Sequence, residues 1–113
     1  MTHVINIDTR RIIDWKSFHD VFSISLGFPS TYGRNMNAWV DCVTSLDNPG
    51  AGMTKVHAAK GGIVTLLLEH VEEFAQRSPE LMKAIEESAA FVNWRRMEGG
   101  QPAVIALAYF RGA

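Results

Sequence analysis

The sequence contains one cysteine, Cys42, among 113 residues. A lone cysteine excludes an intrachain disulfide and favours a reducing compartment. The first residues lack the basic and then apolar order of a signal peptide, and no apolar run approaches the roughly 18 residues that span a bilayer. We therefore expect a cytoplasmic protein that has no membrane partner.

Net charge is also nearly absent. The chain carries 11 basic and 12 acidic residues, which gives a formal net charge of −1 at pH 7. Proteins that bind nucleic acid usually present a basic face, so we expect no direct binding of nucleic acid. Any electrostatic recognition must come from the local arrangement of charges and not from bulk charge.

The usual signatures of metal and cofactor sites are missing too. The histidines His3, His19, His57 and His70 form no pair at helical i, i+4 spacing, and one cysteine cannot form a CxxC motif. The glycine-rich segment 47–62 lacks the residue order of a phosphate-binding loop. We therefore expect neither a metal nor a cofactor.

What the sequence does contain is the patterning of one α/β domain, residues 1–113. Its 47% hydrophobic and 20% charged residues are typical of a globular protein, and the length fits a single domain. Strand patterns alternate with helix patterns, which implies right-handed crossovers and a parallel sheet. We expect a small α/β domain with a three-stranded parallel sheet packed with about four helices. The expected elements are strand 3–7, helix 15–26, a helix from 35, a loop insertion at 47–62, strand 63–68, helix 69–77, helix 78–97 and strand 103–110.

Two kinds of apolar residue are assigned to the core. The segments 63–68 and 103–110 are almost continuously apolar, which is typical of strands buried on both faces. The tryptophans Trp15, Trp39 and Trp94 are assigned to the core and not to a surface for stacking.

The most informative stretch is 27–46, where a turn-forming loop leads into a helix. Asn35 can cap this helix, because its side-chain oxygen can accept from a free N–H of the first turn, and Gly33 allows the turn before it. Apolar residues recur at helical spacing, at Met36, Trp39, Val40, Val43 and Leu46. The opposite side carries Asn37, Asp41, Thr44 and Ser45. This pattern places one carboxylate, Asp41, in the middle of a polar helix face.

This stretch resembles the barstar family, whose members inhibit the secreted ribonuclease barnase. The matching residues are Pro29, Tyr32, Gly33, Asn35, Ala38, Asp41, Cys42, Val43 and Thr44. The resemblance implies that the loop and helix plug the active site of a partner, where the acid at position 41 meets the basic and histidine residues that would hold the substrate phosphate. A carboxylate can mimic phosphate because its charge-assisted bonds to arginine are strong and geometrically defined. The partner-binding residues expected from this are Thr31, Tyr32, Arg34, Asn35, Asn37, Asp41, Thr44 and Ser45.

The sequence departs from the family at charged positions. Arg34 and Asn37 stand where the family has acids, and an acid expected on the last helix falls near Arg95 or Arg96. The two neighbouring arginines also have a simpler explanation, since cations at the end of a helix complement its dipole. We therefore expect the partner to present a mixed surface, with a cation for Asp41 and an acid within reach of Arg34.

The leading prediction is a non-enzymatic inhibitor or immunity protein that blocks a cognate toxin, a ribonuclease in the first instance. Two alternatives stay open. The same fold could serve a regulatory complex unrelated to nucleases, with the 47–62 loop as the contact surface, since long loops in compact domains are usually functional or mobile. A small hydrolase could instead use Cys42 with His19, His57 or His70 as base, although a free cysteine is usually a small buried hydrophobe.

Overall fold

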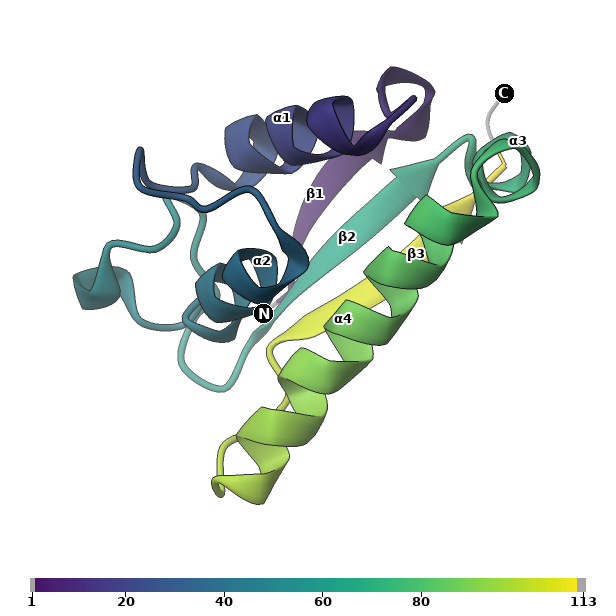
Figure 1. Cartoon of the computed structure of the whole chain (residues 1–113). Helices are drawn as coiled ribbons and strands as arrows, with labels where there is room; N and C mark the ends of the chain where they lie inside the picture. Colours follow the sequence, from purple (N-terminus) through teal and green to yellow (C-terminus); the bar gives the residue numbers. More distant parts are fainter. Residues whose placement is uncertain (1, 112–113) are drawn as a thin grey trace.

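A computed structural model describes residues 2–111 of the chain (Figure 1). It consists of β1 (Thr2–Asp8), α1 (Trp15–Leu26), α2 (Met36–Thr44), β2 (Ile63–Glu69), α3 (Val71–Arg77), α4 (Pro79–Glu98) and β3 (Ile105–Phe110). Short 3-10 helices at Thr9–Arg11 and Pro49–Ala51 lie in the connections. The prediction of an α/β fold with a three-stranded parallel sheet and four helices is confirmed.

The strands lie in the order β1-β2-β3, so that each crossover moves one place in the same direction. Two right-handed crossovers that step the same way place their helices on the same face of a sheet. Figure 1 shows this arrangement, with α1, α2 and α4 all in front of the sheet. The protein therefore has two layers, and its core lies between the sheet and one layer of helices.

The open face of the sheet corrects one prediction. Along β2, burial alternates, with Val64, Leu66 and Leu68 buried and the residues between them only partly covered. On the far face, Val4 of β1 is 51% exposed and Phe110 of β3 is 48% exposed. The prediction that the apolar strands are buried on both faces is wrong, because no helix of the described residues covers the second face.

Local signals set the ends of α1 as predicted. The Asp14 side chain accepts from the Ser17 N–H at 2.8 Å, and Gly27 ends the helix in the left-handed conformation at φ 69°. Trp39 of α2 is fully buried, as predicted. The same prediction is wrong for Trp15, which is 38% exposed at the start of α1, and for Trp94 of α4, which is 61% exposed.

The 47–62 segment packs on the core. The backbone N–H groups of Lys55 and Val56 both donate to the Leu26 carbonyl, and the Ala58 N–H donates to the Leu46 carbonyl. Gly27 makes the first of these contacts possible, since a Cβ there would overlap the Lys55 side chain. Because the C-terminal end of α1 and the residue Leu46, just after α2, hold this segment, the long connection is an ordered part of the domain. Among residues 2–111, no helix is long and apolar enough to cross a membrane.

Candidate functional site

The entry to α2 is built from the residues that the sequence suggested. Asn35 accepts from the Ala38 N–H at 2.8 Å through Oδ1 and donates to the Gly33 carbonyl at 3.3 Å through Nδ2. These bonds satisfy one free N–H of the first turn and tie the cap to the preceding loop. Asn35 remains exposed but is already engaged within the chain.

The burial of one side of α2 fixes what the other side presents. Trp39, Val40, Cys42 and Val43 are buried against the core. The residues left at the surface are Asn37 and Asp41, which are exposed, and Thr44 and Ser45, which are partly buried. The structure thus brings Asn37, Asp41 and Thr44 together on one helix face, as the periodicity predicted.

Asp41 is not alone on this face, because Arg95 of α4 reaches across to it. Arg95 Nη2 donates to Thr44 Oγ1 at 3.1 Å and lies 3.5 Å from Asp41 Oδ1. The guanidinium also lies over the Phe91 ring, 5.7 Å from its centroid. The Asp41 side chain is 61% exposed and that of Arg95 44% exposed, so this pair is open to solvent and weak. The helix-dipole explanation misses this contact between residues 54 positions apart.

Arg96 has a different role from its neighbour. Only 3% of Arg96 is exposed, and its guanidinium pairs with the Asp47 carboxylate through two bonds of 2.7 and 3.1 Å. It also donates to the carbonyls of Thr44 and Pro102, each at 2.9 Å. The Arg96 guanidinium holds the pKa of Asp47 below its usual range. Arg96 therefore fastens the end of α2 and the lead into β3 to α4, and Arg95 is the arginine that faces the candidate site.

The loop before α2 is anchored to α1 through Tyr32. Its hydroxyl lies 2.6 Å from His19 Nδ1, and its ring packs on Phe28 with centroids 4.6 Å apart. Burial raises the pKa of Tyr32 and lowers that of His19, so the pair stays uncharged at neutral pH. Tyr32 is therefore partly buried, whereas the neighbouring Thr31 is exposed.

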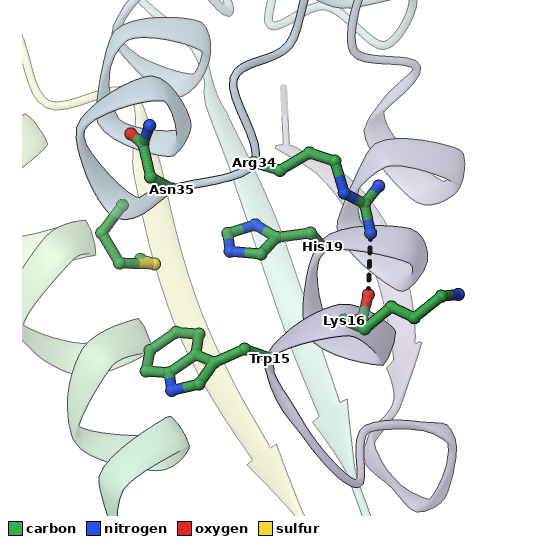
Figure 2. A pocket seen from close by; sticks show the side chains of 6 residues that line it. Trp15, Lys16, His19, Arg34 and Asn35 are labelled. Atoms are coloured by element: carbon green, nitrogen blue, oxygen red, sulfur yellow. Dashed lines mark hydrogen bonds between the residues drawn. The ribbon is translucent and has the colours of Figure 1, made fainter.

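Arg34 also turns toward α1. It donates to Asp20 Oδ1 at 2.8 Å and to the Lys16 carbonyl at 3.1 Å, and its backbone is left-handed at φ 55°. Such a conformation costs about 1 kcal/mol or more in a residue other than glycine. A groove of about 440 Å³ lies beside Arg34, and Figure 2 shows the side chains that line it. The lining residues are Trp15, Lys16, His19, Arg34, Asn35 and Met36. Arg34 thus holds the loop before α2 to α1 and is also a cation at the surface.

The structure also shows the state of Cys42. Its side chain is 2% exposed, and burial raises the pKa of the thiol to about 11. An activated nucleophile needs the opposite, an accessible thiol of low pKa. The hydrolase alternative therefore loses its nucleophile, and within the described residues no group of three potential metal ligands comes together.

Burial of Cys42 predicts a protected thiol. We expect Ellman's reagent to leave native protein unmodified at pH 8 for as long as the fold persists, and to react with one thiol at once in denaturant. The denatured sample supplies the matched control, because it has the same single cysteine. Rapid stoichiometric reaction of the native protein would contradict the burial of this side of α2.

A rigid helix that presents one carboxylate among amides and hydroxyls, beside an inert thiol, is suited to binding. The fold places the chain among small α/β proteins with a three-stranded parallel sheet and four helices. The model of the family Barstar (barnase inhibitor) matches residues 2–105, nearly the whole chain, and the chain belongs to this family. Members of the family are inhibitors rather than enzymes and bind a ribonuclease partner. No curated protein matches the chain.

Proposed function

We propose that this protein is a non-enzymatic inhibitor or immunity protein that binds a cognate toxin, a ribonuclease, and blocks its active site. The surface that does so is the face from Thr31 to Ser45, with Asp41 at its centre. Membership of the barstar family supports this proposal, because the family is one of ribonuclease inhibitors.

The observation that carries the proposal is the setting of Asp41. The carboxylate is well exposed at 61%, yet its helix is held by a capped start and by the Arg96–Asp47 pair at its end. A charged group on a rigid element loses little entropy when it binds, which favours affinity. A nuclease active site that holds a phosphate offers cations for such a carboxylate.

The charges around Asp41 indicate which charges the surface of the partner presents. Arg95 lies on the α4 side of the face, and Arg34 lies at the start of α2 with its guanidinium on Asp20. Several cations pressed against this face would meet these arginines as well as Asp41, and like charges in an interface are costly. The partner that fits best presents one cation to Asp41 and acidic or neutral groups to the two arginines.

The test is retrieval of the partner from the native host with two columns. One column carries the wild-type protein and the other carries Asp41→Ala, and both are washed at moderate salt. The proposal predicts a protein that only the wild-type column retains and that cleaves RNA once it is eluted. A retained protein that both columns hold equally, or one without nuclease or other toxic activity, would contradict the proposal.

Arg95 should compete with the partner for Asp41. Replacement by alanine frees the carboxylate and removes a cation that repels the partner's cation, while an exposed pair of this kind contributes only about 0–1 kcal/mol to stability. We therefore expect Arg95→Ala to tighten binding to the retrieved partner by up to about five-fold, measured by calorimetry.

The matched control is Arg10→Ala, which removes a cation from an exposed pair with Asp8 at the other end of the fold. It changes net charge equally and should leave affinity unchanged. If Arg95→Ala instead weakened binding ten-fold, Arg95 would be a contact of the partner and not a competitor for Asp41.

A further inference from the structure

The groove beside Arg34 has the size of a small-molecule site. Its volume of about 440 Å³ lies within the roughly 300–1,000 Å³ that such sites occupy. The residues that line it come from the first turns of α1 and from the entry to α2, and they are Trp15, Lys16, His19, Arg34, Asn35 and Met36. A groove that combines apolar side chains with a few polar groups is the usual place for a ligand.

His19 brings an unpaired polar atom to this groove. Only 5% of the residue is exposed, and its Nδ1 atom lies 2.6 Å from the Tyr32 hydroxyl. The other ring nitrogen, Nε2, has no hydrogen-bond partner within residues 2–111. The side-chain atoms that are both unpaired and fully buried there are Trp39 Nε1 and His57 Nδ1, so Nε2 still reaches solvent through the groove that His19 lines. Since buried polar groups are normally paired, Nε2 is available to a ligand.

Trp15 gives the groove an aromatic surface. Its ring stacks on that of His19, with centroids 6.0 Å apart and planes at 24°, and meets Phe18 edge-on at 5.3 Å. These contacts hold the indole in place and leave it partly exposed. Met36, which is partly buried, adds a thioether to the lining. A flat apolar group can pack on both side chains.

Two cations give the groove a positive end. Lys16 and Arg34 are both exposed and share one carboxylate, that of Asp20, at 2.9 and 2.8 Å, so one positive charge remains in excess. The bonds of Arg34 to α1 use only Nη2, which leaves other N–H donors of its guanidinium for a ligand. Figure 2 shows Trp15 on one side of the His19 ring, and the two cations lie on the other side. The groove therefore suits a ligand with one apolar and one anionic end.

We propose that this groove binds a small aromatic carboxylate. The aromatic ring packs on Trp15 and Met36, and the carboxylate lies toward Lys16 and Arg34. A single excess positive charge matches a monoanion, and a planar carboxylate fits the donors of a guanidinium. His19 lies between the two ends of the ligand and reports its presence. This site does not rest on the function proposed above, because it needs no protein partner.

The test is a nuclear magnetic resonance titration of the full chain with phenylacetate and, as the matched probe, phenylacetamide, which has the same shape without the charge. Phenylacetate should shift the Trp15 indole N–H and the His19 Nε2 signal saturably, with a Kd of about 5 mM or lower. Phenylacetamide should bind about five-fold more weakly or less. The absence of saturable shifts, or equal binding of the acid and the amide, would overturn the proposal.

Two pairs of variants place the ligand. Lys16→Gln should bind phenylacetate about two- to five-fold more weakly, whereas Lys83→Gln, which removes an exposed lysine from a similar i, i+4 pair on α4, should bind as wild type does. Trp15→Ala should lose saturable binding. Its control is Ile24→Ala, because Ile24 is exposed and lies two and a half turns from Trp15, on the opposite side of α1.

Circular dichroism checks that the four variants are folded. A folded Trp15→Ala variant that binds phenylacetate as wild type does would overturn the proposal. Equal losses in Lys16→Gln and Lys83→Gln would also overturn it, because they would show a general effect of charge and not a contact in the groove. The comparison of acid and amide on the wild-type chain decides the question even if Trp15→Ala unfolds.

Discussion

Asp41→Ala should lose binding to the cognate partner while the protein stays folded. The carboxylate is the charged centre of the proposed face, and truncation of such a residue in an interface costs at least about 2 kcal/mol, or roughly thirty-fold in Kd. The variant also leaves Arg95 without its acidic neighbour, which adds a repulsive cation to the face. Calorimetric titration of the retrieved partner measures the loss, and thermal melting should show little change because alanine favours the helix.

Two further variants separate charge from shape at this position. Asp41→Asn keeps the size of the side chain and removes its charge, so it should lose nearly as much affinity as Asp41→Ala. Glu73→Ala removes an exposed acid from α3 and should leave affinity unchanged. Equal affinity of wild type and Asp41→Ala would show that the partner binds elsewhere.

Trp39→Ala should lose stability instead. Trp39 is fully buried and packs edge-on against Phe22, with ring centroids 5.6 Å apart. Truncation of a buried tryptophan costs about 3–5 kcal/mol, against a total of roughly 5–15 kcal/mol for a domain. Urea unfolding followed by circular dichroism should therefore show a much lower midpoint or a protein that is already unfolded.

The comparison with Trp39→Phe makes this prediction sharper. The Trp39 Nε1 group is buried without a hydrogen-bond partner among the described residues, and phenylalanine removes that polar atom while it keeps an aromatic ring. The cost of Trp39→Phe should therefore be below about 1.5 kcal/mol. Trp94→Ala serves as the surface control, and it should unfold as wild type does. A Trp39→Ala variant that is as stable as wild type would contradict the position of α2 against the core.

The sequence predicts best what depends on neighbours in the chain. Asn35 and Gly27 mark helix ends through their own backbone preferences, and α2 begins where Asn35 indicates. Its apolar spacing also identifies Asp41 as a surface residue. These features need only local geometry, which the order of residues determines.

The sequence predicts poorly the contacts between segments that are far apart in the chain. Arg95 and Asp41 are 54 positions apart, and only the packing of α2 on α4 brings them together. The continuous apolar pattern of the strands does not reveal the open face of the sheet, because that depends on which face both crossovers choose. Periodicity also predicts too much burial for residues at the edge of an apolar helix stripe, as the exposed Trp15 shows.

Titration of the retrieved nuclease with this protein, followed by its rate of RNA cleavage, tests the central claim most directly. If the Thr31–Ser45 face blocks the active site, cleavage should fall linearly and reach zero at one molecule of inhibitor per nuclease, and Asp41→Ala at the same ratio should leave most of the activity. A nuclease that binds the wild-type protein at saturation and still cleaves RNA at its full rate would contradict the account.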